Sequence, residues 1–143
     1  MSLQTKIETA QIPGTEIKSS RIALGTWAIG GWMWGGSDDA LSIRTIQSAV
    51  DRGITLIDTA PVYGFGHAEE IVGVALRGRR AQVAIATKAG LDWKDGKPFR
   101  NASRGRILQE IDDSLRRLQT DVIDLYQVHW PDPNVRWKRP PAR

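Results

Sequence analysis

The stretch from 53 to 64 reads Gly-Ile-Thr-Leu-Ile-Asp-Thr-Ala-Pro-Val-Tyr-Gly, and it decides the fold. Its largely apolar run from Ile54 to Ile57 stops abruptly at Asp58, which is the pattern of a short buried strand. The same pattern recurs twice, in an apolar run that ends at Lys88 and in another that ends at His129. Near-continuous apolar strands of this kind predict a parallel sheet with both faces covered.

Segments with helical periodicity separate these strands. A first helix is expected to begin at an N-cap Ser37 and to stop at Gly53. A second helix is predicted over 69–76, and a polar loop is predicted between Lys88 and a third helix. The expected inward-facing positions are Ile43, Ile46, Ala49 and Val50 in the first helix, and Ile107, Leu108, Ile111, Leu115 and Leu118 in the third. The alternation indicates consecutive βα units.

The N-terminal segment predicts a hairpin. Its strands are expected at 6–10 and 16–18, on either side of the turn signal Pro13-Gly14. A short strand over 21–24 then ends at Gly25, so the chain reads as a hairpin followed by about four βα units. A doubly wound sheet and a (β/α)8 barrel both fit. A complete barrel takes about 250 residues, whereas this chain has 143.

The composition is that of an ordinary globular protein, with 41% hydrophobic and 25% charged residues. The absence of cysteine excludes disulfides, thiolate metal sites and cysteine nucleophiles. No apolar run is long enough to span a membrane, and the first residues show no secretory signal. We therefore expect a cytoplasmic protein that binds neither a membrane nor nucleic acid.

The net charge of +4 belongs to the C-terminal segment 133–143. This segment holds four cations and no acid, so the rest of the chain sums to zero and offers no basic face for nucleic acid. Its prolines and missing apolar period exclude a helix interior. We expect residues 1–132 to form the domain, and 133–143 to be a basic, proline-rich tail that is disordered or out of frame.

Four polar residues are placed where chemistry is expected. Asp58, Lys88 and His129 end three predicted strands, and Tyr63 lies in the loop after Asp58. The carboxyl ends of parallel strands form one rim, so these side chains are expected to converge. In isolation, each has a structural explanation, such as a helix-capping Asp. Three ionisable groups on successive strand ends are hard to assign to chance.

These residue types suit proton transfer to a carbonyl oxygen. A phenol is a poor acid near neutrality, because its ordinary pKa is about 10, and a neighbouring ammonium favours the phenolate. Asp58 would pair with Lys88 and hold it in position, while His129 would either donate a hydrogen bond to the substrate oxygen, and so orient the substrate, or relay the proton. No cluster with metal-ligand spacing is visible, so no metal is predicted. Reduction by a nicotinamide hydride with a general acid fits best.

Tryptophans gather near the same rim. Trp27, Trp32 and Trp34 lie in the first loop after a strand, and Trp130 directly follows His129. Aromatic side chains at this place would wall a substrate cleft. Simple packing of the loop is the competing interpretation. The sequence Gly64-Phe65-Gly66 begins like a dinucleotide-binding motif but lacks its third glycine, and we interpret it as a turn.

The chain resembles the aldo-keto reductase family over about residues 5 to 132, the first half of a family member. The matching segments are Gly25-Thr26-Trp27, residues 53–64, Ala86-Thr87-Lys88, residues 113–118, and residues 124–132. The stretches Asp-Thr-Ala-x-x-Tyr-Gly and Asp-Leu-Tyr-Gln-Val-His-Trp-Pro are highly specific. The resemblance implies a (β/α)8 barrel with a hairpin closing its bottom.

The resemblance also implies roles for residues. Tyr63 matches the proton donor of the family, and Asp58, Lys88 and His129 match the rest of its catalytic tetrad. It implies NADPH (NADP) as cofactor, in contact with Gly25, Thr26, Trp27 and Asp58, and a small-molecule carbonyl substrate against Trp27, Trp32, Trp34 and Trp130. Most cofactor contacts of the family come from its second half, so the chain is expected to be nearly inactive alone.

Two other classes remain open at this point. A non-catalytic relative that binds nucleotide or regulates a channel, or a truncated relic of an enzyme, would keep the fold without turnover. A response-regulator-like domain would also place acids at strand ends, but it predicts an acidic pair where this chain has Gly25-Thr26-Trp27. A half barrel would leave two strand edges unpaired, which predicts self-association through them.

Overall fold

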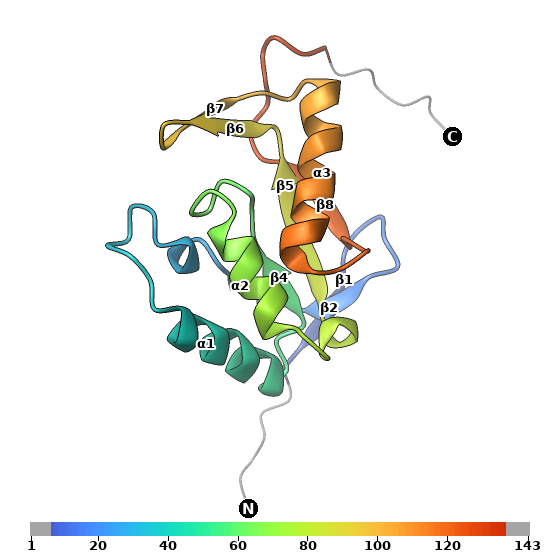
Figure 1. Cartoon of the computed structure of the whole chain (residues 1–143). Helices are drawn as coiled ribbons and strands as arrows, with labels where there is room; N and C mark the ends of the chain where they lie inside the picture. Colours follow the sequence, from blue (N-terminus) through green and yellow to red (C-terminus); the bar gives the residue numbers. More distant parts are fainter. Residues whose placement is uncertain (1–6, 137–143) are drawn as a thin grey trace, which may run out of the picture.

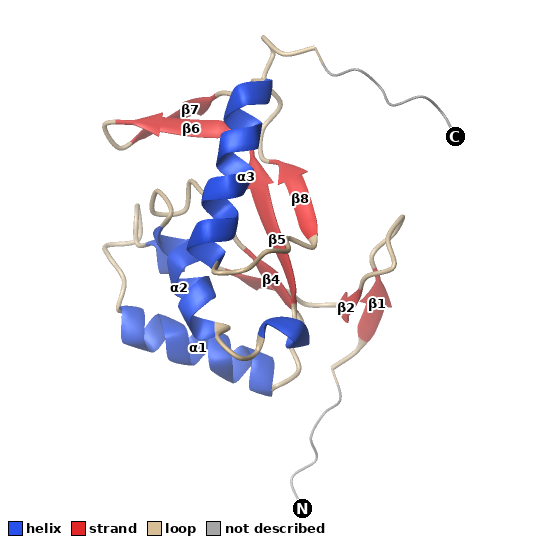
Figure 2. Ribbon diagram, turned by 45° about the vertical axis from the view of Figure 1, so that its right-hand side comes forward, coloured by secondary structure: helices blue, strands red, loops and turns tan. Residues whose placement is uncertain are grey.

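The computed structural model describes residues 7–136 of the chain. Its centre is a four-stranded parallel sheet with the order β3-β4-β5-β8. These strands span Leu24–Gly25, Leu56–Asp58, Ala84–Ala89 and Leu125–Val128. The helices are α1 (Asp39–Asp51), α2 (His67–Ala75) and α3 (Arg104–Leu118), and they lie on one face of the sheet (Figures 1 and 2). The expected partial barrel of βα units is confirmed.

The N-terminal hairpin is present, with its strands displaced from the expected positions. It consists of β1 (Thr9–Gln11) and β2 (Lys18–Ser20), which pair antiparallel with Thr9 opposite Ser20. The turn uses Gly14 at φ +77°, a conformation that glycine adopts at little cost. Ser20 and Thr55 exchange backbone-to-hydroxyl hydrogen bonds of 2.8 and 3.0 Å, which tie the hairpin to the segment entering β4.

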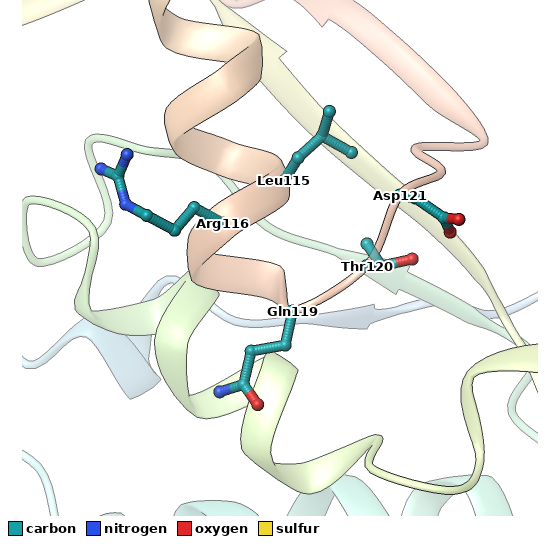
Figure 3. Close-up of a pocket in the computed structure, with 5 residues that line it drawn as sticks. All are labelled: Leu115, Arg116, Gln119, Thr120 and Asp121. Carbon is teal, nitrogen blue, oxygen red and sulfur yellow. The ribbon is translucent and has the colours of Figure 1, made fainter.

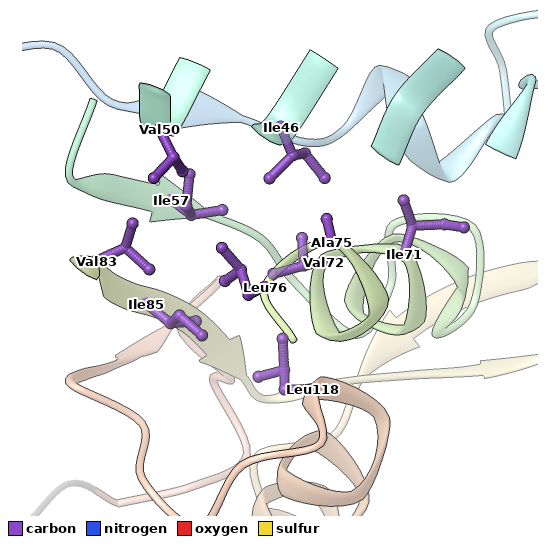
Figure 4. Packing of buried hydrophobic residues seen from close by; sticks show 10 residues of the cluster. All are labelled: Ile46, Val50, Ile57, Ile71, Val72, Ala75, Leu76, Val83, Ile85 and Leu118. Atoms are coloured by element: carbon purple, nitrogen blue, oxygen red, sulfur yellow. The ribbon is translucent and has the colours of Figure 1, made fainter. Parts of the chain in front are cut away.

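The core lies between the helices and the sheet (Figure 4). Its buried members are Ile46, Val50, Ile57, Ile71, Val72, Ala75, Leu76, Val83, Ile85 and Leu118. Ile46, Ile57 and Ile85 are completely buried, and each such side chain contributes about 1.5–3 kcal/mol of transfer free energy. This packing fixes β4 and β5, the strands that carry the candidate site.

Three sequence-based expectations were wrong. The N-cap of α1 is Asp38 rather than Ser37, because the Asp38 carboxylate accepts the Leu41 N–H at 2.9 Å. The segment expected to be a polar loop contains an antiparallel hairpin, β6 (Leu91–Lys94) and β7 (Lys97–Arg100). Its tip is Asp95-Gly96, with φ of +50° and +72°, a turn chemistry typical of a tight hairpin.

The third error concerns the buried face of α3. The apolar pattern predicted Leu108 to face inward, yet Leu108 is 48% exposed. The buried residues of the helix are Glu110, Ser114 and Leu118, spaced four apart and therefore on one stripe. The Gly90 N–H, between β5 and β6, donates to Glu110 at 2.9 Å, so α3 turns a largely polar stripe inward, which its apolar periodicity conceals.

Two further local expectations concern the turn at Gly64-Phe65-Gly66 and the C-terminal segment. Gly64-Phe65-Gly66 forms a turn, with Phe65 at φ +57° and Gly66 as the N-cap of α2. Pro133 and Asn134 form a turn, which is closed by the Val135 N–H donating to the Asp132 carbonyl at 3.2 Å. The rest of the predicted tail, 137–143, lies outside the described residues, as does Lys6. No described helix is long and apolar enough to cross a membrane.

Candidate active site

The carboxyl ends of three parallel strands bring the predicted polar residues to one rim. Asp58 is the last residue of β4, Lys88 lies near the end of β5, and His129 directly follows β8. The register places Asp58 beside Ala86 and Lys88 beside Gln127, so the strand ends are staggered around one point. The pattern of apolar runs that end in ionisable residues therefore corresponds to a real cluster.

An ion pair forms the base of this cluster. Lys88 Nζ lies 2.8 and 2.9 Å from the two Asp58 carboxylate oxygens and donates a third hydrogen bond to the Thr59 carbonyl at 3.0 Å. The Lys88 side chain is 14% exposed and that of Asp58 is 34% exposed. The ammonium is thus held by three acceptors, while the carboxylate keeps partial contact with water.

Tyr63 completes the cluster from the loop after β4. Lys88 Nζ lies 3.4 Å from the Tyr63 hydroxyl oxygen and 5.0 Å from the centre of its ring. The backbone of this loop packs directly on the first loop, since a Cβ added to Gly30 would lie 2.5 Å from the Tyr63 carbonyl carbon. Gly64, at φ +64°, permits the same close approach. Glycines therefore set the position of the phenol.

His129 closes the other side of the cluster. Its ring centre lies 5.7 Å from that of Tyr63 in an edge-on arrangement, and its backbone N–H donates to the Ala89 carbonyl at 2.8 Å. Burial, and then the neighbouring Lys88 ammonium, lower the pKa of His129 from its ordinary value, while Asp58 opposes them. The imidazole is consequently neutral at neutral pH and can donate or accept a hydrogen bond.

Aromatic side chains surround the mouth of the site. Trp27 stacks on Tyr63 with 6.2 Å between ring centres, and Trp34 meets Trp27 edge-on at 5.6 Å. Trp130 lies 5.9 Å from His129. A cavity of about 360 Å³ is lined by Trp27, Trp32, Met33, Val62, Tyr63, Leu91, Pro98, His129 and Trp130. Three of the four predicted tryptophans therefore line the cavity, and Trp34 contacts Trp27 without lining the cavity.

Four lining residues were missed by the sequence reasoning, and one of them, Val62, directly precedes Tyr63. Met33 follows Trp32 in the first loop, and Leu91 and Pro98 belong to the β6–β7 hairpin. The signal for the hairpin was present in Asp95-Gly96, which follows a short alternating segment. The polar character of residues 92–101 outweighed that signal in the prediction.

The residues predicted to contact the cofactor differ in how accessible they are to a ligand. Gly25 ends β3 opposite Asp58 in the parallel register, and a Cβ added there would meet nothing within 4 Å. Thr26 is fully buried, and its hydroxyl donates to the Asp58 carbonyl at 3.0 Å. Gly25 and Trp27 are therefore open to a ligand, whereas the Thr26 side chain holds the ends of β3 and β4 together.

The residues that line the cavity fit the nicotinamide end of a dinucleotide cofactor. The cavity offers flat aromatic walls beside Tyr63 and His129, which suit a planar ring. Its lining contains no Lys or Arg that would pair with a phosphate. Within residues 7–136, no group of three or more His, Cys, Asp or Glu side chains could hold a metal ion.

A larger hollow of about 610 Å³ lies at the end of α3 (Figure 3). Its lining residues are Leu115, Arg116, Gln119, Thr120 and Asp121. They flank the connection that enters β8, so this hollow lies at the opposite end of the strands from the polar cluster. It contains none of the predicted site residues, and the strand-end cavity remains the candidate active site.

Comparison with known proteins identifies the family of the chain. The model of the Aldo/keto reductase family matches residues 21–138. Aldo-keto reductase YhdN of Bacillus subtilis is 63% identical over 131 residues, which cover 90% of this chain and 40% of the relative. The NADH-specific methylglyoxal reductase of Escherichia coli is 45% identical over 81% of this chain and 40% of its own length. The chain belongs to the aldo-keto reductase family.

Solved structures agree with this assignment. A glycerol dehydrogenase of Gluconobacter oxydans has a TM-score of 0.80 at 57% identity, covering 89% of this chain and 40% of its own. An aldo-keto reductase of Klebsiella pneumoniae in complex with NADPH has a TM-score of 0.69 at 32% identity, covering 88% and 40%. The chain thus spans about 40% of the length of these relatives.

Proposed function

We propose that the strand-end site serves the NADPH-dependent reduction of aldehydes or ketones to alcohols, with Tyr63 as the proton donor. The observation that carries this proposal is the contact between the Tyr63 hydroxyl and the Lys88 ammonium, 3.4 Å apart at the edge of an aromatic cavity. A proton donor and a stabiliser of the anion it leaves are the two groups that carbonyl protonation requires.

Each member of the cluster has a distinct proposed role. Tyr63 donates its phenolic proton to the carbonyl oxygen of the substrate, and Lys88 stabilises the phenolate that remains. Asp58 fixes the ammonium through two hydrogen bonds. His129, which is neutral, orients the substrate oxygen by a hydrogen bond. The reduced nicotinamide, when bound, supplies the hydride that the carbonyl carbon accepts.

The cofactor proposal is NADPH, with NADH as the alternative. The Klebsiella structure contains NADPH, whereas the Escherichia coli relative is NADH-specific. In this chain Gly25, Thr26, Trp27 and Asp58 would border the reacting end of the cofactor. Measuring turnover with each cofactor at equal concentration decides between them. A cytoplasmic location remains our prediction.

The proposed substrate is a small carbonyl compound enclosed by aromatic side chains. Trp27, Trp32 and Trp130 line the cavity, and Trp34 packs edge-on against Trp27. Apolar walls with a few convergent polar groups are typical of small-molecule sites. The names of the relatives, methylglyoxal reductase and glycerol dehydrogenase, supply test compounds for both directions of the reaction.

A chimera tests the function most directly, because the chain spans about 40% of its relatives. Residues 1–132 would replace the matching part of Bacillus subtilis YhdN, and NADPH oxidation would be followed with methylglyoxal. We expect Tyr63→Phe to lower kcat by about 10²–10⁴-fold. Tyr126→Phe, which removes the other tyrosine, is the matched control and should keep most of the rate. Equal rates with and without the Tyr63 hydroxyl would refute the proposed role.

The 143-residue chain assayed by itself tests how much of the function it holds. We expect little or no NADPH oxidation, because the lining of the cavity offers no partner for a phosphate. Fast oxidation that Tyr63→Phe abolishes would contradict this expectation. Tight NADPH binding by the chain, combined with an inactive chimera, would instead favour a non-catalytic nucleotide-binding relative.

Self-association through the open edges is a further proposal. In the described sheet β3 and β8 are edge strands with one neighbour each. Exposed apolar side chains lie near the β8 edge, including Val122 at 53% and Val128 at 45% exposed, and α3 adds Leu108 at 48%. Unpaired edges of this kind promote pairing between chains. Sedimentation velocity of the full chain should show a dimer, and a compact monomer at micromolar concentration would contradict the proposal.

A further inference from the structure

A buried carboxylate lies beneath the hairpin that walls the cavity. Glu110, on the inner stripe of α3, is 1% exposed, and its Oε2 accepts the Gly90 N–H at 2.9 Å. Gly90 is the residue between β5 and β6. The second oxygen, Oε1, is buried without a hydrogen-bond partner among the described residues and lies 3.8 Å from the Arg106 guanidinium. Glu110 therefore anchors the residue at which the β6–β7 hairpin begins.

Arg106 acts on the same hairpin one helical turn earlier. Its guanidinium lies 3.5 Å from the Asp92 carboxylate and stacks over Trp93, 5.5 Å from the ring. The Arg106 side chain is only 12% exposed, so these contacts are largely shielded from water. A cation over an indole face in such surroundings is more favourable than at an exposed site. Glu110 thus contacts the residue that precedes β6, and Arg106 contacts two residues of β6 itself.

The hairpin in turn is part of the cavity wall. Leu91 and Pro98 line the cavity directly. Trp93 lies 5.7 Å from Phe65, and Phe65 lies 5.1 Å from Trp32, so a row of three aromatic rings joins the hairpin to the first loop. Any movement of β6 therefore changes the packing against Trp32, a residue of the proposed substrate wall.

We propose that Glu110 and Arg106 are positioning residues for the substrate cavity, and that the charge on Glu110 sets how firmly they hold the β6–β7 hairpin against it. The effect of these residues on substrate binding rests on the proposed function, because that proposal takes the cavity to be the substrate site. The anchoring itself rests on the contacts to Gly90, Asp92 and Trp93. A neutral Glu110 releases its attraction for Arg106, which then retains Asp92 as its carboxylate partner.

The groups facing Glu110 make its charge responsive near neutral pH. Burial raises the pKa of Glu110 to about 7, and the carboxylates of Glu69 on α2 and Asp92 on β6 add to the rise. The Gly90 N–H and the Arg106 guanidinium oppose it. From β8, Tyr126 also faces this group, and burial followed by the Glu110 charge raises the pKa of its phenol. Arg117 on α3 is the remaining charge near Tyr126.

The fluorescence of Trp93 tests the proposal on the full chain. Emission would be recorded from pH 5 to 9 for the unmodified chain and for Trp93→Phe, and their difference reports Trp93. We expect a transition near pH 7 in that difference, with its amplitude lost in Glu110→Gln. Asp112→Asn, which removes an exposed carboxylate from the same helix, should retain it. A flat difference, or a transition that persists in Glu110→Gln, would overturn the proposal.

Hydrogen exchange provides a second measurement that does not depend on Glu110→Gln folding. In Arg106→Gln we expect the amides of residues 91–100 to exchange at least about tenfold faster, while those of β4 keep their rates. Unchanged exchange in the hairpin would overturn the anchoring. Neither measurement needs cofactor or turnover, so a failure of the proposed reductase function is distinguishable from a failure of this inference.

Discussion

Two neighbouring residues of β5, Thr87 and Lys88, reach opposite faces of the sheet and meet carboxylates of very different accessibility. The Thr87 hydroxyl donates to Glu69 Oε1 at 2.6 Å on the helix face, where Arg117 Nε also donates to Glu69 Oε2 at 2.7 Å. Lys88 pairs with Asp58 on the cavity face at 2.8 Å. Alternation along a strand explains the division.

The difference between the two ion pairs lies in what each can touch. Glu69 is completely buried and Arg117 is 12% exposed, so this pair is sealed between α2, α3 and β5. Asp58 is 34% exposed, and its partner Lys88 lies 3.4 Å from the hydroxyl of Tyr63, which lines the cavity. Similar ion-pair chemistry therefore stabilises structure on one face and is available for a reaction on the other.

The largest effect is expected from breaking the sealed pair. Glu69→Ala leaves the Arg117 guanidinium buried without its carboxylate and removes the acceptor of the Thr87 hydroxyl. Breaking a buried pair in this way costs about 3–5 kcal/mol. Urea denaturation followed by circular dichroism measures it. Glu70→Ala, at the exposed neighbouring position, should stay within about 0.5 kcal/mol. Similar losses in both variants would show that Glu69 is not sealed as described.

A smaller effect is expected from the pH dependence of Glu110, the other buried carboxylate of this region. Its pKa is raised to about 7 by burial, above an ordinary value of 4.5, so the folded chain binds its proton more tightly than the unfolded chain. The free energy of unfolding should therefore fall by about 2–3 kcal/mol as the pH rises from 5 to 8.

The difference between the chain and Glu110→Gln isolates this contribution. His129 has a lowered pKa and contributes in the opposite direction, since its folded form binds its proton less tightly. That contribution is common to both proteins and cancels. Urea midpoints measured between pH 5 and 8 should fall in the chain relative to Glu110→Gln. A constant difference across this range would contradict a titrating Glu110.

The open pair should cost less to break. Lys88→Met keeps the length of the side chain but removes the ammonium beside Asp58. Because the Asp58 carboxylate is partly hydrated, we expect the free energy of unfolding to fall by about 1–2 kcal/mol. This value lies between those expected for exposed and for fully buried ion pairs. Urea denaturation next to Glu69→Ala checks the order. A loss for Lys88→Met equal to that for Glu69→Ala would erase the distinction between the two faces.

The same two faces explain what the sequence could predict. Asp58, Lys88 and His129 were predicted because each ends an apolar run, and Tyr63 because it lies in the loop after Asp58. The family resemblance then matched Tyr63 to the proton donor. The buried polar contacts of α3 could not be predicted from the sequence. Glu110, for example, accepts a hydrogen bond from the Gly90 N–H, which lies twenty residues away along the chain. Apolar periodicity assigned Leu108 to the interior instead. Buried polar partners are set by tertiary packing, which local patterns do not encode.

The smallest effect is expected from a fully exposed pair, which completes the series. Arg21 and Glu8 join the ends of the N-terminal hairpin at 2.6 Å, with side chains 64% and 75% exposed. Water and salt screen this contact, so a double-mutant cycle of Glu8→Ala and Arg21→Ala should give a coupling below about 0.5 kcal/mol. The coupling should shrink further in 0.5 M salt. The backbone hydrogen bond from Arg21 to Glu8, at 2.9 Å, is retained in every variant, so the cycle reports the side chains. A coupling as large as the Lys88→Met loss would mean that exposure does not rank these ion pairs, and the contrast between the two faces of β5 would need another cause.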